Sequence, residues 1–293
     1  MTDVLIIGGG PAGVTAALYT ARAGLKTAIL YKDHGALGKA AKIDNFYGHM
    51  EISGETLVNN GLQQAKNVGI DIINEEAVGI TLNEDQTLTV GTAAAEYTTH
   101  AVVIATGASR ATPQIKGLAE LEGKGVSYCA ICDGFFHKGK DVAVIGSSAY
   151  ALHEVEDLLP IAKTVTLLTN GAEPLVKFPE SVTVKTEKIL EITGQATMMG
   201  DVLGGVTLEG GEAIPLSGLF VAIGVAGGTA LARKLGAVIE NNAVTVDQQL
   251  RTTVPGVWAA GDCTGGLKQI VKASHEGAMA GMDIVKTLKE RAK

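Results

Sequence analysis

The clearest indication of the fold lies in residues 3–13, Asp3-Val4-Leu5-Ile6-Ile7-Gly8-Gly9-Gly10-Pro11-Ala12-Gly13. The β-branched run predicts a short buried strand, and residues 11–23 place small and apolar side chains at helical spacing. Between strand and helix stand Gly8, Gly10 and Gly13 in the spacing G-x-G-x-x-G. The first glycine permits a tight turn, the second lets the backbone approach a pyrophosphate, and the third lets the helix pack closely on the sheet. Because the helix N-terminus offers unpaired N–H groups to phosphates, the stretch predicts a dinucleotide-binding unit.

A second unit of the same kind begins at Asp141. Residues 142–145 predict a strand, Gly146-Ser147-Ser148 a turn, residues 150–162 a helix, and residues 164–168 another strand. This repeat of strand, turn, helix and strand predicts a second nucleotide-type fold later in the chain.

The two units imply two domains of related architecture, because 293 residues are more than one hydrophobic core usually holds. A polar, proline-containing stretch at 108–117 and a glycine-rich stretch at 224–228 predict the crossings between them. We expect an α/β protein with two nucleotide-binding, Rossmann-like, three-layer domains. The first is discontinuous and consists of residues 1–112 and 226–293, and the central domain, residues 113–225, is inserted into it.

The composition excludes several classes of partner. The 38 glycines and the low aromatic content of 4% favour an α/β protein with many tight turns. A formal net charge of −7 and a pI of about 5.4 argue against nucleic acid or an anionic membrane as the main partner. The apolar run at residues 4–7 is too short for a leader or a membrane span, so we expect a cytoplasmic protein.

The most specific chemistry lies in residues 128–134, Tyr128-Cys129-Ala130-Ile131-Cys132-Asp133-Gly134. Two residues between cysteines allow a reversible disulfide and a thiolate of depressed pKa. A structural zinc site would need two further ligands at similar spacing, and the sequence has no second C-x-x-C and no paired histidines, so we expect no metal. Asp133 is either a proton donor and acceptor during thiol exchange or an aspartate of the turn. Cys263, which stands alone, is expected to be a small buried apolar residue.

Acidic residues at strand ends are candidates for cofactor binding. The second strand ends in Leu30-Tyr31-Lys32-Asp33. The acid that usually binds a ribose at the end of this strand is therefore either missing, with Tyr31 in its place, or displaced to Asp33. Gly261-Asp262 follows another apolar run and offers a carboxylate that can accept hydrogen bonds from a polyol such as the ribitol of FAD. A turn-forming aspartate is the alternative at that position.

Taken together, these motifs resemble the low-molecular-weight thioredoxin reductases over nearly the whole chain. The segments that carry the resemblance are 7–13, 43–46 (Ile43-Asp44-Asn45-Phe46), 105–107 (Ala105-Thr106-Gly107), 127–144, 218–224, and 255–263 followed by Gln269-Ile270. The resemblance implies a homodimeric, FAD-dependent enzyme that reduces thioredoxin. It also implies that Cys132 lies next to the flavin, that Cys129 attacks the substrate disulfide, and that Asp133 is the acid.

The same resemblance implies which residues bind FAD. Asp262 would hold the ribitol, and the backbone at Gln269-Ile270 would face the isoalloxazine, with the positive end of the terminal helix directed at the ring. The full set of expected cofactor-binding residues is Gly8, Gly10, Pro11, Ala12, Gly13, Tyr31, Lys32, Asn45, Ala105, Thr106, Gly107, Gly261, Asp262, Lys268, Gln269 and Ile270.

The second glycine loop departs from the family pattern, in which the central domain binds NADPH. Ser148 stands where the close-approach glycine is expected, and the bulky Tyr150 follows it. No arginine follows the strand at 164–168, although a ribose 2′-phosphate needs a charged fork. NADPH is therefore not expected. These losses resemble the ferredoxin-dependent flavin thioredoxin reductases, which take electrons from a protein donor.

Several alternatives remain open at this point. The chain could be an NADPH-dependent thioredoxin reductase with a divergent nucleotide site, an oxygen-dependent dithiol oxidase, or a redox-inactive FAD-binding scaffold. His275 either tunes the flavin or is an ordinary helix-surface histidine. Four lysines, which could meet an acidic ferredoxin or simply be solvated, are Lys39, Lys42, Lys138 and Lys140.

Overall fold

A computed structural model describes residues 1–108, 113–198, 200–223 and 227–291. The chain divides into two compact units, which we call the outer unit (Met1–Ser109 with Gly227–Lys293) and the central unit (Arg110–Ala226). The predicted domain boundaries, at 112/113 and 225/226, lie at the edges of segments that are outside the described residues. The same is true of much of the predicted linker at 108–117 and of the glycine-rich stretch at 224–228. These boundaries stay predictions.

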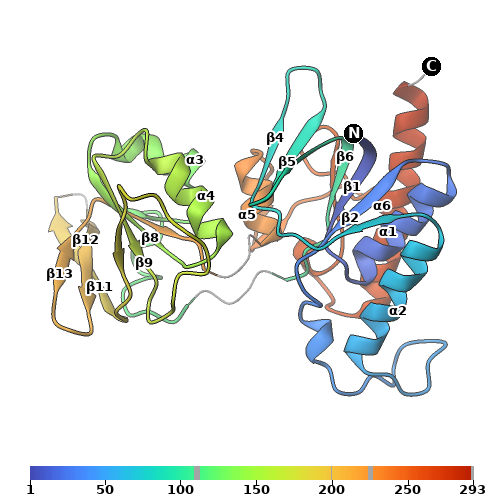
Figure 1. Ribbon diagram of the computed structural model, residues 1–293, viewed down its shortest axis with the longest axis horizontal. Helices are drawn as coiled ribbons and strands as arrows, with labels where there is room; N and C mark the ends of the chain where they lie inside the picture. Colours follow the sequence, from blue (N-terminus) through green and yellow to red (C-terminus); the bar gives the residue numbers. More distant parts are fainter. Residues whose placement is uncertain (109–112, 199, 224–226, 292–293) are drawn as a thin grey trace. The chain divides into compact units, whose positions relative to one another are not determined.

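The outer unit is built on a mixed sheet in the order β3-β2-β1-β6-β5-β4, with β17 also on β6 (Figure 1). Its strands are β1 (Thr2–Ile7), β2 (Thr27–Leu30), β3 (Asp71–Ile73), β4 (Gly79–Leu82), β5 (Leu88–Gly91), β6 (Glu96–Ile104) and β17 (Val257–Ala259). The strands β3, β2, β1, β6 and β17 run parallel, and β4 and β5 form an antiparallel extension. Since parallel strands share one carboxyl edge, the loops after β1, β2, β6 and β17 open on the same side.

Helices cover the sheet of the outer unit. They are α1 (Pro11–Arg22), α2 (Gly54–Asn67), α5 (Gly228–Lys234) and α6 (Ile270–Arg291), with the short turns η1 (Leu37–Lys39) and η3 (Asp262–Thr264) and the ribbon β15 (Ile239–Glu240) and β16 (Ala243–Val244). The helices α1, α2 and α6 lie on one side of the sheet (Figure 1). Helix α6 approaches α1 so closely that a Cβ on Gly277 would lie 2.2 Å from the carbonyl oxygen of Ala12. Glycine is therefore required where the two helices cross. This close crossing places the first part of α6 beside the glycine loop.

The central unit has a parallel sheet in the order β10-β9-β8-β14-β7 and an antiparallel sheet in the order β11-β12-β13. The elements are β7 (Val126–Ser127), α3 (Ala130–Asp133), η2 (Gly134–His137), β8 (Asp141–Ile145), α4 (Ala149–Leu158), β9 (Thr164–Leu168), β10 (Thr183–Lys185), β11 (Ile189–Thr197), β12 (Gly200–Leu208), β13 (Ala213–Pro215) and β14 (Gly218–Val221). The predicted α/β class with two Rossmann-like units is confirmed.

Some predicted bounds were wrong. The helix predicted at 150–162 runs from Ala149 to Leu158, because Pro160 has no backbone N–H with which to continue the helical hydrogen bonds. The antiparallel strands β4, β5, β11, β12 and β13 were not predicted as elements, since their pairing depends on partners that the local pattern does not reveal.

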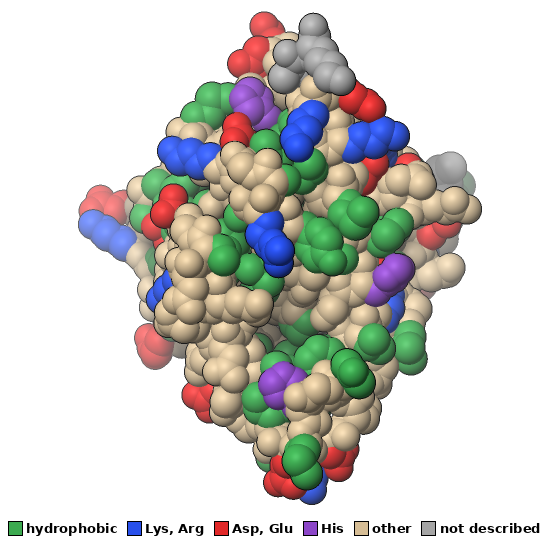
Figure 2. Space-filling model, turned by 90° about the vertical axis from the view of Figure 1, so that its right-hand side faces the viewer, with side chains coloured by type: hydrophobic (Ala, Val, Ile, Leu, Met, Phe, Trp, Pro, Cys, Tyr) green, Lys and Arg blue, Asp and Glu red, His purple; other side chains and the backbone are tan. Residues whose placement is uncertain are grey.

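Apolar side chains also reach the surface of the outer unit. Figure 2 shows hydrophobic side chains among charged ones on the face that carries the helices α1, α2 and α6. Large apolar side chains of this unit that are well exposed are Tyr47, Met50, Leu267, Val271 and Met282. The outer unit therefore has apolar surface that a single chain leaves uncovered.

Candidate redox and cofactor sites

The glycine loop after β1 has the geometry of a phosphate cradle. At Gly8 φ is +123°, and a Cβ there would lie 2.2 Å from the carbonyl oxygen of Ala105. A Cβ on Gly13 would lie 1.9 Å from the carbonyl oxygen of Gly8, whereas one on Gly10 would meet no described heavy atom within 4 Å. Gly8 and Gly13 are therefore required for packing, and Gly10 borders open space. Helix α1 has no side-chain cap at Gly10, so its N-terminus is available to an anion.

The predicted residues after β2 have protein partners of their own. Lys32 forms an ion pair with Glu76 at 2.5 Å, and the backbone N–H of Tyr31 donates to the carbonyl of Ile73. The Asp33 carboxylate accepts from the N–H of Gly35, as an aspartate of a turn does. Tyr31 and Lys32 lie at the carboxyl end of β2, on the same edge of the sheet as the glycine loop.

Residues far apart in the chain meet at the same edge. The Asn45 side-chain amide donates to Gln269 Oε1 at 3.3 Å across a separation of 224 residues. Gln269 precedes the first residue of α6, Ile270, and Lys268 beside it is exposed. Ala105, Thr106 and Gly107 follow β6, and the Ala105 N–H donates to the carbonyl of Ile7, which holds this segment against the glycine loop.

The turn at Gly261-Asp262 is held by an ion pair that the sequence reasoning missed. Lys272 Nζ donates to the carbonyls of Gly261 and Gly265 at 2.7 Å each and to Thr264 Oγ1 at 2.8 Å. Glu276 pairs with Lys272 at 3.0 Å and accepts from the Gly261 N–H at 2.7 Å. The only signal in the sequence was a lysine and a glutamate four residues apart at the start of the terminal helix.

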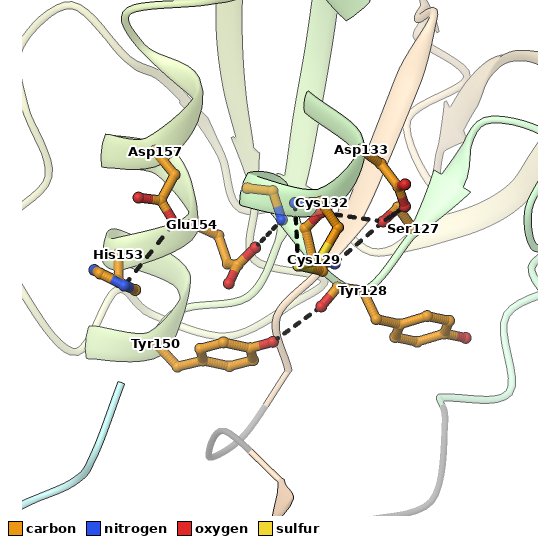
Figure 3. Close-up of a disulfide and its surroundings, with 10 residues drawn as sticks. Ser127, Tyr128, Cys129, Cys132, Asp133, Tyr150, His153, Glu154 and Asp157 are labelled. Carbon is orange, nitrogen blue, oxygen red and sulfur yellow. Dashed lines mark hydrogen bonds and ion pairs between the residues drawn. A yellow bond between two sulfur atoms is a disulfide. The ribbon is translucent and has the colours of Figure 1, made fainter. Parts of the chain in front are cut away.

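In the central unit, Cys129 and Cys132 form a disulfide with their Cα atoms 5.3 Å apart (Figure 3). Cys129 follows β7 and is the N-cap of α3, where its sulfur accepts from the Cys132 N–H at 3.2 Å. The side chain of Cys129 is 1% exposed, whereas Cys132 is exposed. Of the two cysteine residues, Cys132 is therefore the exposed one in this state.

Asp133 is linked to the cysteine loop through Ser127. The Ser127 hydroxyl donates to Asp133 Oδ2 at 2.6 Å and accepts from the Cys129 N–H at 3.1 Å (Figure 3). Ser127, Asp133, Phe136 and His137 border a hollow of about 260 Å³. Burial, and then the charge of Lys140, lower the pKa of His137, against the opposite effect of Asp133. The ring of His137 is therefore neutral near pH 7, and Asp133 is the acidic side chain that borders this hollow.

Helix α4 also contacts the cysteine loop, and sequence reasoning missed this function. Glu154 Oε2 accepts from the Ala130 N–H at 2.6 Å, and the Tyr150 hydroxyl donates to the Tyr128 carbonyl at 3.3 Å. Tyr150 was noticed only as a bulky residue beside the second glycine loop.

The second glycine loop is closed by the chain itself. Ser148 is 5% exposed and Tyr150 3% exposed. The backbone N–H of Leu175 donates to the carbonyl of Ser147 at 2.7 Å, so the segment after β9 lies against this loop. Residues 169–176 contain no lysine or arginine. This segment therefore supplies no cation of its own to a phosphate, although the side chain of Lys188 lies beside Gly171.

Two further residues considered in the sequence are Cys263 and His275. Cys263 is buried, its thiol donates to the Ile104 carbonyl at 3.2 Å, and burial raises its pKa to about 12. His275 is exposed on α6. Among the described residues, no group of three or more His, Cys, Asp and Glu side chains could hold a metal ion. Within the same part of the chain, no helix is both long and apolar enough to cross a membrane.

Comparison with known proteins agrees with this geometry. Residues 2–277 match the family described as pyridine nucleotide-disulphide oxidoreductase. The chain belongs to this family. It is 34% identical to the thioredoxin reductase of Aquifex aeolicus over 310 aligned residues, which cover 99% of this chain and 94% of the relative. Within the family it therefore belongs with the low-molecular-weight thioredoxin reductases.

Two solved structures are informative neighbours. The atypical thioredoxin reductase TRi from Desulfovibrio vulgaris Hildenborough is similar with a TM-score of 0.91 and 35% identity, covering 99% of both chains. A ferredoxin-flavin thioredoxin reductase from Clostridium acetobutylicum is similar with a TM-score of 0.73 and 26% identity, covering 99% of this chain and 98% of that one. The protein is a flavin-dependent thiol–disulfide oxidoreductase. The open space at Gly10 and the uncapped N-terminus of α1 fit the pyrophosphate of FAD.

Proposed function

We propose that this protein is an FAD-dependent thioredoxin reductase that receives its electrons from reduced ferredoxin and does not use NADPH. The observation that carries the proposal is the second glycine loop, where the buried Ser148 stands at the position of the close-approach glycine. A dinucleotide needs its pyrophosphate against the helix N-terminus with close backbone approach. A side chain at this position opposes that approach.

The charges around the second loop support the same conclusion. NADPH differs from NADH by a 2′-phosphate, which Arg side chains bind through bidentate hydrogen bonds. In this chain the segment after β9 is Thr169-Asn170-Gly171-Ala172-Glu173, and it contributes a carboxylate where a cation is needed. The likeness to a ferredoxin-flavin thioredoxin reductase of 26% identity supports a protein donor.

The cysteine pair would carry out the exchange with thioredoxin. FAD, when bound, supplies a group that can accept electrons singly and pass them on as a pair. With two electrons and two protons, the Cys129–Cys132 disulfide becomes a dithiol. The Cys129 thiolate then attacks the thioredoxin disulfide, and Cys132 resolves the mixed disulfide, so thioredoxin leaves as a dithiol and the Cys129–Cys132 bond reforms. Because Cys129 is buried in the oxidised pair, reduction must uncover its sulfur.

Asp133 is proposed as the proton donor to the thiolate that leaves during exchange. Its carboxylate is linked through the Ser127 hydroxyl to the Cys129 backbone, which keeps it beside the sulfur atoms. We further propose a homodimer in the cytoplasm. The exposed apolar side chains Val271 and Met282 on α6 support an interface on the outer unit.

Anaerobic stopped-flow measurement of flavin absorbance tests the donor. We expect reduced ferredoxin to bleach the flavin, and thioredoxin reduction to follow at a matching rate. NADPH should leave the flavin oxidised even at millimolar concentration. Bleaching by NADPH at a rate compatible with turnover, with no reaction from ferredoxin, would show that the proposed donor is wrong. Formation of peroxide from small dithiols in air, without ferredoxin, would instead indicate a dithiol oxidase.

A further inference from the structure

Helix α4 holds the cysteine loop at two points. The Tyr150 hydroxyl donates to the carbonyl of Tyr128, just before Cys129, and Glu154 accepts from the N–H of Ala130, just after it. Figure 3 shows both side chains extending from α4 toward the disulfide. Because Tyr150 and Glu154 lie one helical turn apart, they share a face of α4. Both side chains are buried, at 3% and 1% exposed.

The position of this contact in the fold is informative. In a nucleotide-binding unit, the start of the helix after the glycine loop belongs to the pyrophosphate. Here the first turn of α4 carries Tyr150, and Tyr150 and Glu154 both contact the redox loop. The helix that would bind a nucleotide therefore supports the disulfide.

The position of Glu154 bears on the chemistry of the thiols. Its Oε2 atom accepts from the backbone N–H of Ala130, the residue directly after Cys129, so a charge on this carboxyl group would lie next to the thiol. A negative charge beside a thiol also opposes its ionisation. Charged or titratable groups around the cysteine loop are Asp133 on α3, His137 on η2, and Tyr150, His153, Glu154 and Asp157 on α4.

We propose that Tyr150 and Glu154 form a clamp on residues 128–130, and that Glu154 is ionised and acts as a positioning residue that favours the protonated form of the reduced thiols. The inference rests on the proposed redox role of Cys129 and Cys132 and does not depend on the electron donor. A protonated dithiol is oxidised more slowly by oxidants other than the substrate, since the thiolate is the reacting form.

Alkylation of the reduced holoenzyme as a function of pH tests the clamp. The protein is reduced with dithiothreitol, desalted anaerobically and treated with iodoacetamide, and the label on each cysteine is quantified by mass spectrometry. Glu154→Gln keeps the hydrogen-bond acceptor and removes the charge. We expect the apparent pKa of the faster thiol to fall by about one unit, which raises its alkylation rate roughly tenfold below that pKa.

Two further variants make the test specific. Glu156→Gln removes an exposed carboxylate from the same helix and should leave the profile unchanged. Tyr150→Phe removes only the hydroxyl, so it should keep the thiol pKa but speed hydrogen exchange in the peptide that contains residues 128–130.

The outcomes separate this inference from the proposed function. Coincident pH profiles for wild type and Glu154→Gln would overturn the role of Glu154, and unchanged exchange in Tyr150→Phe would overturn the clamp. If dithiothreitol exposes no reactive Cys129 or Cys132 in any variant, the redox role itself is wrong, and the inference falls with it.

Discussion

Replacing Lys272 by Met should weaken FAD binding more than it weakens the fold. The Lys272 ammonium donates three hydrogen bonds to the turn between Gly261 and Gly265 and pairs with Glu276. That turn presents Asp262, the proposed partner of the FAD ribitol. Methionine keeps much of the apolar stem of lysine, so packing is largely retained while every polar contact of the ammonium is lost.

The magnitude follows from the burial of the pair. The side chains of Lys272 and Glu276 are 17% and 15% exposed, so loss of one partner leaves the other charge mostly without water. Breaking a fully buried pair costs about 3–5 kcal/mol, and the residual exposure favours the lower end, about 3 kcal/mol. If the turn orders only when FAD binds, a loss of this size lowers the affinity by about 100-fold. If the turn is already ordered in part, the loss is smaller but still about tenfold.

Fluorescence titration of the apoprotein with FAD measures the affinity directly. Lys289→Met, which removes an exposed lysine from the last turn of the same helix, is the matched control and should bind FAD normally. Thermal unfolding of both apoproteins reports on the fold itself. A dissociation constant for Lys272→Met within threefold of wild type would refute the reasoning. A large drop in the unfolding temperature with unchanged affinity would show that Lys272 supports α6 and not the flavin turn.

Two further predictions concern Cys263 and Asp283. Because burial raises the pKa of Cys263 to about 12, its thiol is protonated at pH 8, and iodoacetamide should label only Cys129 and Cys132 in the reduced folded protein. Intact-mass analysis would contradict this if a third label appeared before unfolding. Asp283 accepts from Arg251 Nε at 2.6 Å and from the Trp258 indole at 2.9 Å, so Asp283→Ala should lower the free energy of unfolding by about 3 kcal/mol. Urea denaturation measures it, and a change below about 1 kcal/mol would be too small for this network.

The parts that could be predicted from the sequence are those in which local spacing alone sets the geometry. The spacing of Gly8, Gly10 and Gly13 predicts a tight turn at a helix start, and the structure places all three glycines there. The spacing of Cys129 and Cys132 predicts a disulfide at short range, and the structure has that bond. In both places the residues that define the motif lie within one short segment of the chain.

The contacts that could not be predicted join segments distant in the chain. Asn45 meets Gln269 only because strands and helices bring the carboxyl edge of the sheet together, and no pattern in either segment names the other. Glu154 lies 24 residues from Ala130, and neither segment indicates the other as a partner. Such partners depend on packing, which an alternation of apolar and polar residues does not encode.

The central unit holds its disulfide in place through contacts of its sheet and of helix α4. Strand β14 pairs with both β7 and β8, and β7 leads directly into the cysteine loop, so the sheet holds that loop in place. Helix α4 packs on the same sheet and supplies Tyr150 and Glu154 to the loop. Ser148 takes the position of the close-approach glycine in the second glycine loop, whereas the sheet and Glu154 contact the cysteine loop itself. The disulfide is therefore positioned by contacts that do not require a bound nucleotide.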